Sequence, residues 1–349
     1  MAQNFSIRAG AQALKHIQDK GLSPQDITTI PAAAGGPKWI VLYALDKYLL
    51  SEWFADRDTP LNLIGASAGA WRMLCYALDK PEEALSAFLK TYIEQRYDHM
   101  PAPAVVSQNV IDILKEILAA SGQQGLWKAA NKRLYVISSE SSFTPRPQSN
   151  YKRQFGKIVV KNALSRSFLK NELNRIVFTN SDHRPLVEDG ITTKYIRFNS
   201  ENLVPALQST GTLPLYMAPV SDVPEVSGLL WDGALIDYHI CHQYHDEGLV
   251  FYPHFTDKLI AGWFDKFVPW RKEGKAFKER MVVISPSASF VQSLPDHKIP
   301  DRKDFNRYFD DNDTRIQNWY EVAKRGEDIA EEFDTLYKSG ALIDHIELL

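Results

Sequence analysis

The sequence predicts an α/β protein with a three-layer α/β/α arrangement around a mostly parallel central sheet. Short apolar runs typical of buried strands alternate with longer stretches in which apolar residues recur at helical spacing. Two predicted strands, 27–30 and 61–64, are each followed by a glycine-rich turn and then a helix. The 349 residues, 44% of them hydrophobic and 24% charged, are enough to bury a large core.

The first third of the chain sets up this alternation. An amphipathic stretch predicts an opening helix, Trp39 to Leu49 carry apolar residues at helical spacing, and Pro81 with two following glutamates is typical of a helix start. In chain order we expect a helix over 8–20, a strand over 27–30, a helix over 39–49, a strand over 61–64, a helix over 70–76, a helix from 81, and a helix from 106 to about 122.

The rest of the chain continues with short β-branched and aromatic runs, which are typical of strands. We expect strands over 134–137, 175–178, 195–198, 228–231, 249–252, 259–261 and 281–284, a short helix over 202–208, a loop over 209–216, and a C-terminal helix through Ile316 and Phe333.

Residues Gly65 to Gly69 form a G-x-S-x-G motif centred on Ser67, directly between a predicted strand and a predicted helix. A sharp turn at this place lifts the serine hydroxyl clear of the backbone. The small Ala66 and Ala68 allow close approach, and the helix N-terminus favours developing negative charge. Ser67 is therefore predicted to be a nucleophile. The alternative is a packed turn in which Ser67 only caps the helix.

A second glycine-rich turn, Gly35-Gly36-Pro37-Lys38, follows the preceding predicted strand. In a parallel sheet this turn lies at the same edge as Ser67, where glycine amides can donate to an oxyanion. A plain loop before a helix is the alternative. A P-loop is excluded because the glycines are not followed by Lys-Ser or Lys-Thr at the required spacing.

Asp232 ends the apolar strand 228–231 and precedes Gly233 and Ala234. A carboxylate at a strand end can reach into a cleft, and partial desolvation would raise its pKa enough for it to take the Ser67 proton. Since isolated Asp-Gly pairs often begin turns, a turn role for Asp232 is the alternative.

Together these motifs resemble the patatin-like phospholipases, which pair a G-x-S-x-G serine with an aspartate in an Asp-Gly-Gly/Ala motif and build the oxyanion hole from a glycine-rich loop ending in Arg or Lys. The resemblance implies a patatin-like fold and a serine acyl hydrolase of the phospholipase A or lipid esterase type. It implies Ser67 as nucleophile, Asp232 as general base, and an oxyanion loop of Gly35, Gly36 and Lys38. It implies no metal and no organic cofactor.

The resemblance covers roughly residues 27–236 and includes departures in the glycine loop. Ala33 and Ala34 stand where the family usually has Asp and Gly, Pro37 has no N–H, and Trp39 replaces a glycine. These departures motivate a second hypothesis, a catalytically silent protein that binds a lipid or a partner on the same fold.

The histidines of the chain motivate two further alternatives. A Ser-Asp-His hydrolase would use Ser67, Asp232 and one of four histidines, namely His239, His242, His245 or His254. The segment 239–247 also contains ligand types that suit a metal ion, although a polar surface turn is the favoured interpretation.

The segment from Trp263 to Lys272 mixes aromatic and basic residues. Such a mixture suits contact with a lipid interface. The favoured interpretation is that the aromatic side chains pack the C-terminal helix against the core.

Composition narrows the class of protein. The formal net charge is -3 and no long run of one sign occurs, so no nucleic-acid partner is expected. Two cysteines give no disulfide framework, and neither a signal peptide nor a membrane span is expected. We therefore expect a cytoplasmic protein, peripheral at a membrane where it meets a lipid ester. We expect a catalytic domain over 1–262 and a partly helical C-terminal extension over 263–349 packed on it.

Overall fold

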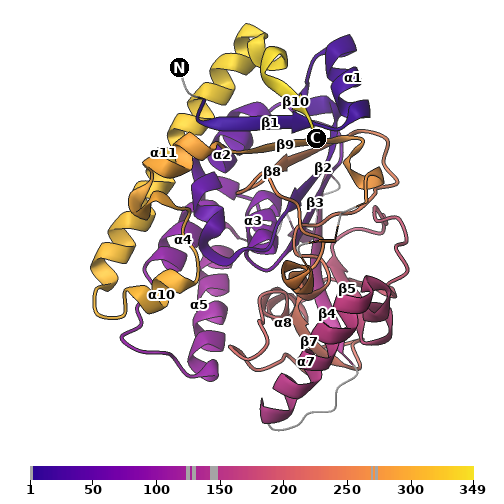
Figure 1. The fold of residues 1–349 in the computed structure, drawn as a ribbon, viewed down its shortest axis with the longest axis vertical. Helices are drawn as coiled ribbons and strands as arrows, with labels where there is room; N and C mark the ends of the chain where they lie inside the picture. The colour runs from indigo at the N-terminus through magenta and orange to yellow at the C-terminus, as the bar shows by residue number, and fades with distance from the viewer. Residues whose placement is uncertain (1–2, 123–125, 128–130, 142–147, 269, 272–273) are drawn as a thin grey trace.

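The computed structural model describes residues 3–122, 126–127, 131–141, 148–268, 270–271 and 274–349. Within these residues ten strands form one sheet that crosses the molecule (Figure 1). Their order is β10 (Ile346–Leu348), β1 (Phe5–Ala9), β9 (Met281–Pro286), β8 (Leu249–Pro253), β2 (Ile27–Ala32), β3 (Leu61–Ala66), β4 (Lys132–Ser141), β5 (Leu173–Thr179) and β6 (Thr193–Arg197), with β7 (Leu229–Asp232) also paired to β4.

The centre of the sheet is parallel. Strands β9, β8, β2, β3 and β4 pair in parallel, as do β1 with β10 and β5 with β6. Antiparallel pairing joins β1 to β9, and β4 to both β5 and β7. All six residues of β3 are buried, as expected for a central parallel strand covered on both faces. The predicted α/β class with a mostly parallel sheet is confirmed.

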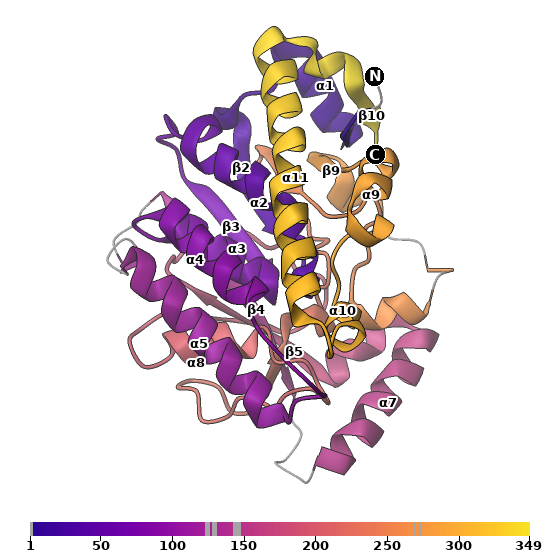
Figure 2. The same cartoon turned by 90° about the vertical axis from the view of Figure 1, so that its left-hand side faces the viewer.

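Helices connect and cover these strands. The α-helices are α1 (Ala11–Lys20), α2 (Tyr43–Tyr48), α3 (Ala68–Ala77), α4 (Pro81–Ile93), α5 (Pro103–Ser121), α7 (Gln148–Leu164), α8 (Leu203–Ser209), α9 (Ala288–Ser293), α10 (Lys303–Arg307) and α11 (Asn312–Ser339). Helices α2, α3, α4, α5 and α11 lie together on one side of the molecule, whereas α7 lies apart from them (Figure 2). Among the helices that the structure describes, none is both long enough and apolar enough to cross a membrane.

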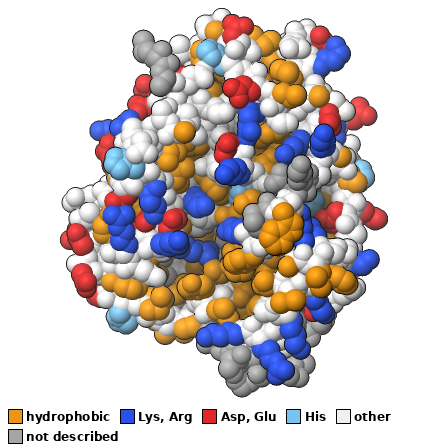
Figure 3. Space-filling model, viewed as in Figure 1, with side chains coloured by type: hydrophobic (Ala, Val, Ile, Leu, Met, Phe, Trp, Pro, Cys, Tyr) orange, Lys and Arg blue, Asp and Glu red, His pale blue; other side chains and the backbone are white. Residues whose placement is uncertain are grey.

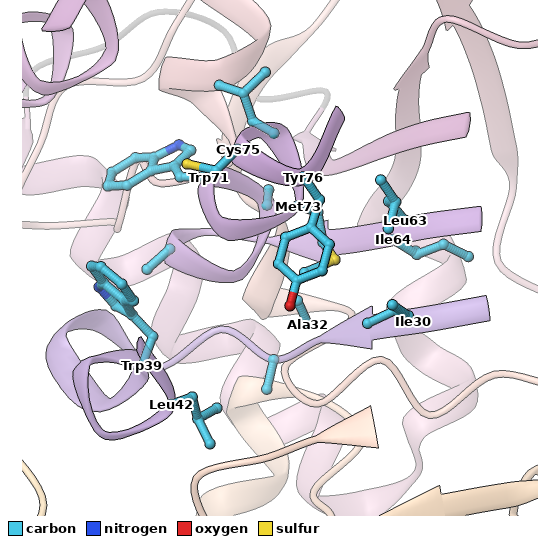
Figure 4. Packing of buried hydrophobic residues seen from close by; sticks show 14 of the residues in the cluster. Ile30, Ala32, Trp39, Leu42, Leu63, Ile64, Trp71, Met73, Cys75 and Tyr76 are labelled. Carbon is cyan, nitrogen blue, oxygen red and sulfur yellow. The ribbon is translucent and has the colours of Figure 1, made fainter. Parts of the chain in front are cut away.

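The main core lies between the sheet and α3. Every residue of α3 is buried, because the helix is enclosed by β2, β3, β4 and α4. Figure 4 shows apolar side chains of β2 and β3 facing those of α3 and of the 3-10 helix η2 (Gly36–Leu42). A smaller apolar cluster joins α7 to β5, β7 and the 3-10 helix η6 (Trp263–Phe267).

Elements on both sides of residue 262 contribute to the sheet. Strands β9 and β10 come from the C-terminal part of the chain, and α11 packs on α2 and η2. A functional division of the chain at residue 262 stays a prediction.

Three predicted elements differ from the structure, and strand β10 was not predicted. Residues 8 and 9 belong to β1, whose alternating burial is that of a strand, and the helix begins only at Ala11. The predicted helix over 39–49 is divided among η2, α2 and the π-helix η3 (Leu49–Trp53). Residues 259–261 form no strand, although Ile260 and Ala261 accept backbone hydrogen bonds from residues 239 and 238. Strand β10 carries no pattern that predicts it, because it is short and exposed at the sheet edge.

Candidate active site

Ser67 lies at the turn between β3 and α3. Its φ of 54° and ψ of -136° place the backbone in a region that costs a non-glycine residue about 1–3 kcal/mol. The turn is held on both sides: Ser67 N donates to Thr210 Oγ1 at 2.9 Å, and Ser67 O accepts from Ala70 N at 2.9 Å. The Ser67 side chain makes no hydrogen bond that would cap α3, so the alternative in which it only caps the helix is not what the structure shows.

The small residues around Ser67 are required by close packing. A Cβ on Gly65 would lie 2.5 Å from the backbone at the start of α3, and a Cβ on Gly69 would overlap the carbonyl oxygen of Ala32 at the end of β2. Ala66 and Ala68 are buried. The G-x-S-x-G motif thus fits β2, β3 and α3 together at the serine.

Asp232 ends β7 and meets Ser67. Ser67 Oγ donates to Asp232 Oδ2 at 3.0 Å, and the backbone N–H of Ala234 donates to Asp232 Oδ1 at 2.8 Å. A Cβ on Gly233 would overlap the carbonyl oxygen of Ile137 in β4, so glycine lets β7 approach this closely. The structure brings together two side chains that are 165 residues apart.

Asp232 is only 1% exposed, and this burial raises the pKa of its carboxyl group. The charges of Arg302 and Lys266 and the hydrogen bonds from Ala234 and Ser67 oppose this rise. A raised pKa makes the carboxylate a better proton acceptor than an exposed aspartate would be.

The glycine loop lies at the same sheet edge as Ser67, because the parallel register pairs Ala32 of β2 with Gly65 of β3. Gly36 has a φ of 58° and lines the cavity that also contains Ser67. Gly36 and Ala68 are the first residues of their helices, where N–H groups lack intrahelical acceptors. In the described part of the chain neither amide donates to another protein group.

The other two residues of the predicted loop pack against Phe255. A Cβ on Gly35 would lie 2.7 Å from the Phe255 ring, and the Lys38 amine lies 5.0 Å from the centre of that ring. Burial is the main cause that lowers the pKa of Lys38.

A mostly apolar cavity of about 130 Å³ opens at Ser67. Its walls come from α3, α4, α5, the loop before α5, the segment after α8, and α10; they include Trp71, Tyr92, Val110, Ile113, Leu213, Met217 and Phe305. A larger cleft of about 980 Å³ lies elsewhere on the molecule, and neither Ser67 nor Asp232 lines it.

Sequence reasoning missed three residues of this site. Thr210 bridges Ser67 N to the carbonyl oxygen of Ile137, and Arg302 and Lys266 bring positive charge close to Asp232. Thr210 lies in a segment predicted only as a loop. Lys266 lies in the aromatic and basic segment from Trp263 to Lys272, but no local pattern places either cation near Asp232.

The four candidate histidines have hydrogen-bond partners or exposure that separate them from Ser67 and Asp232. His242 Nε2 pairs with Asp237 at 3.0 Å, and the Nδ1 atoms of His239 and His254 bond to backbone carbonyls. His245 is exposed. None of these described side chains hydrogen-bonds to Ser67 or to Asp232, so the geometry supplies no Ser-Asp-His triad.

The 239–247 segment does not converge on one point. The ligand-type cluster that the described residues do form is Asp189, Asp237 and His242. Arg175 donates to both carboxylates, at 2.7 Å to Asp189 and 2.6 Å to Asp237, so this cluster is an ion-pair network in which Asp237 and His242 are buried and Asp189 is exposed.

The aromatic segment after Trp263 is divided between core and surface. Phe264 is buried in the small cluster with α7, which corrects the expected packing against the C-terminal helix. Phe267 and Trp270 are 53% and 72% exposed. Pro269 and Lys272 of this segment lie outside the described residues.

Comparison with known proteins identifies a family for this chain. A search of curated proteins finds no match. The sequence model of the family described as Patatin-like phospholipase matches residues 40–241, more than half of the chain and a span that includes both Ser67 and Asp232. The chain therefore belongs to the patatin-like phospholipase family.

Proposed function

We propose that this protein is a serine acyl hydrolase that cleaves fatty-acyl esters of lipids through a Ser67–Asp232 dyad. The 3.0 Å hydrogen bond from Ser67 Oγ to Asp232 Oδ2 carries the proposal, because it allows direct proton transfer within a buried site. Family membership supports a lipid ester as the substrate.

In the first half of the reaction, Asp232 Oδ2 takes the Ser67 proton while Oγ attacks the ester carbonyl carbon. The carbonyl oxygen becomes an oxyanion, and the N–H groups of Gly36 and Ala68 are its candidate donors. Pro37 contributes none, since it has no N–H. Collapse of the intermediate breaks the carbon–oxygen bond to the alcohol, which leaves with the proton from Asp232, and an acyl ester on Ser67 remains.

In the second half, water gives a proton to Asp232 and its oxygen attacks the acyl carbon. The fatty acid leaves, and Ser67 Oγ recovers the proton from Asp232. This sequence needs no metal and no organic cofactor. The apolar cavity at Ser67 is suited to the acyl chain, because its lining is dominated by aromatic and aliphatic side chains.

A fluorophosphonate probe tests the dyad, since its phosphorus bonds to an activated serine oxygen as fluoride leaves. We expect mass spectrometry to find the label on Ser67. Ser67→Ala should abolish labelling, and it should lower ester hydrolysis by about 10⁴-fold or more, with about 10³-fold or more for Asp232→Asn.

Ser139→Ala is the matched control, because Ser139 is a buried serine on β4 that takes no part in the proposed reaction. It should keep full activity. A folded wild-type protein that neither labels at Ser67 nor hydrolyses any ester would instead support the catalytically silent lipid-binding protein.

A further inference from the structure

Three cations lie near the candidate active site: the charges of Arg302 and Lys266 act on Asp232, and that of Lys38 acts on Lys266. Lys38 belongs to η2, Lys266 to η6, and Arg302 directly precedes α10. All three lie outside the 40–241 span that the family model matches. Figure 3 shows Lys and Arg side chains gathered near the middle of one face, above a band of hydrophobic side chains.

The acidic residues next to the two C-terminal cations in the sequence are already paired with other cations. Asp265 pairs with Arg166 at 2.8 Å and also with Arg271, and Asp301 pairs with Lys298 at 3.2 Å. Among the described residues, Lys266, Arg302 and Lys38 form no ion pair within 4.0 Å.

Arg302 lies beside Gly36 of the glycine loop, whereas Lys266 lies against Tyr238. A Cβ on Gly36 would lie 3.0 Å from Arg302 Nε, and Arg302 lines the same cavity as Ser67. The Lys266 amine lies 3.6 Å from the centre of the Tyr238 ring, and the Tyr238 carbonyl oxygen accepts the N–H of Ala34 at 2.9 Å. Arg302 therefore lies next to the loop where the ester carbonyl would lie, and Lys266 lies close enough for its charge to act on Asp232.

The positive charges of Lys38, Lys266 and Arg302 repel one another. Desolvation, together with the charges of Lys38 and Arg302, lowers the pKa of Lys266 to about 7, while Asp232 acts in the opposite direction. Such an arrangement is costly in the free protein, and a bound anion would relieve it. The apolar cavity at Ser67 can bind the acyl chain. The cations are then available to bind an anionic group on the alcohol portion of the ester.

We propose that Arg302 and Lys266, supported by Lys38, form an anion subsite that binds a phosphate group on the alcohol portion of the substrate. The planar guanidinium of Arg302 can donate two parallel hydrogen bonds to phosphate oxygens. These residues thereby determine a preference for phosphate-bearing over neutral lipid esters. The inference rests on the proposed acyl hydrolase function of Ser67.

The test compares kcat/KM for two soluble short-chain diacyl lipids with identical acyl groups, a phosphatidic acid and a diacylglycerol. Arg302→Gln and Lys266→Gln should each lower the phosphate-to-neutral ratio of kcat/KM by about 10- to 100-fold, the equivalent of losing a charged hydrogen bond. Arg302→Lys should retain part of the preference for the phosphate-bearing lipid. Lysine keeps the positive charge but cannot donate the two parallel hydrogen bonds of a guanidinium.

Arg307→Gln is the matched control. Arg307 lies on α10, is half exposed and pairs with Asp296 at 3.0 Å, away from the Ser67 cavity. It should leave the ratio unchanged. Equal losses on both lipids in Arg302→Gln would overturn the subsite, since that residue would then act on the shared acyl-transfer step.

Binding separates failure of the subsite from failure of the proposed reaction. Calorimetry on Ser67→Ala should show tighter binding of the phosphatidic acid than of the diacylglycerol, and adding Arg302→Gln should remove the difference. If the wild type hydrolyses neither lipid but this difference persists, the subsite stands and the hydrolase does not. If inorganic phosphate competes with a neutral ester while the phosphatidic acid gains nothing, the site serves free anions and the substrate preference is overturned.

Discussion

At the scale of the residue, the candidate active site holds groups that the fold does not favour energetically. Ser67 has a strained backbone, and Asp232 is a buried carboxylate with a raised pKa and no cation within ion-pair distance in the described structure. Asp46 is equally buried but receives two hydrogen bonds from Arg72, at 2.8 and 2.6 Å. The same residue type is therefore expected to destabilise the fold at one position and stabilise it at the other.

Asp232→Asn is expected to stabilise the protein at pH 7 by on the order of 1 kcal/mol. A raised pKa in the folded state means that stability falls as pH rises from the unfolded value of 3.8 through the folded value, and it stays lower above that window. Asparagine removes this penalty. Urea unfolding at pH 7 measures the effect.

The paired control is Asp46→Asn, which leaves the Arg72 charge buried and should lower the free energy of unfolding by about 3–5 kcal/mol. If both substitutions destabilise the protein to the same degree, Asp232 is not a strained functional group.

At the scale of the element, the geometry of the site depends on how closely β2, β3 and α3 pack. Gly69 lies within α3, where alanine would normally be the better helix former. Its missing Cβ lets the helix lie directly against the carbonyl oxygen of Ala32. Gly156 lies within α7 with open space around it, so the two positions separate packing from helix propensity.

Gly69→Ala should destabilise the protein by about 2 kcal/mol or more, because the added Cβ meets rigid backbone. Gly156→Ala should stabilise it by about 0.5–1 kcal/mol, since alanine loses less conformational freedom in a helix. Thermal unfolding of the two variants shows whether each substitution raises or lowers the stability relative to the wild type. A stable, fully active Gly69→Ala variant would contradict the packing described for the turn.

At the scale of the whole molecule, an ion-pair network around the buried Arg175 joins separate segments of the chain. Arg175 of β5 donates to Asp237, which follows the 3-10 helix η5 (Gly233–Leu235), and to Asp189 in the loop before β6. Arg175 is the main cause that lowers the pKa of Asp237, and it also lowers that of Asp189 against the effect of burial. This network ties β5 to the segment that follows Asp232 and to the loop before β6.

Because both pKa values are lowered in the folded state, the network contributes stability above the unfolded value of 3.8 and loses it as pH falls below that value. Asp237→Asn should cost about 3 kcal/mol at pH 7 and should flatten the fall in stability between about pH 5 and pH 2. Denaturant unfolding across this range measures both effects.

Asp182→Asn is the control at an exposed pair, where Arg197 lies 3.3 Å away and the Asp182 side chain is 91% exposed. It should change stability by less than about 1 kcal/mol at any pH in the range. If the free energy of unfolding of Asp237→Asn falls between about pH 5 and pH 2 as steeply as that of the wild type, the network does not control acid unfolding.

The sequence by itself determined the features that depend on neighbouring residues. A continuous apolar strand, a turn of small residues and a helix made Ser67 recognisable, and an apolar strand ending in Asp-Gly marked Asp232. Alternation of strands and helices predicted the sheet, because buried parallel strands need apolar residues on both faces. The predictions for residues 8–9 and 259–261 were wrong. These patterns are short, and the structure that they adopt depends on the segments packed against them.

Only the tertiary structure decided how distant segments meet. The sheet brings Asp232 to Ser67 across 165 residues, and Thr210 and Arg302 reach the same point from segments without a catalytic motif. Whether a cation is paired depends on which carboxylates the fold places near it, so Lys266 and Arg302 look ordinary in the sequence. Local patterns fix the elements and the motifs, whereas charge balance, burial and pKa are properties of the assembled site.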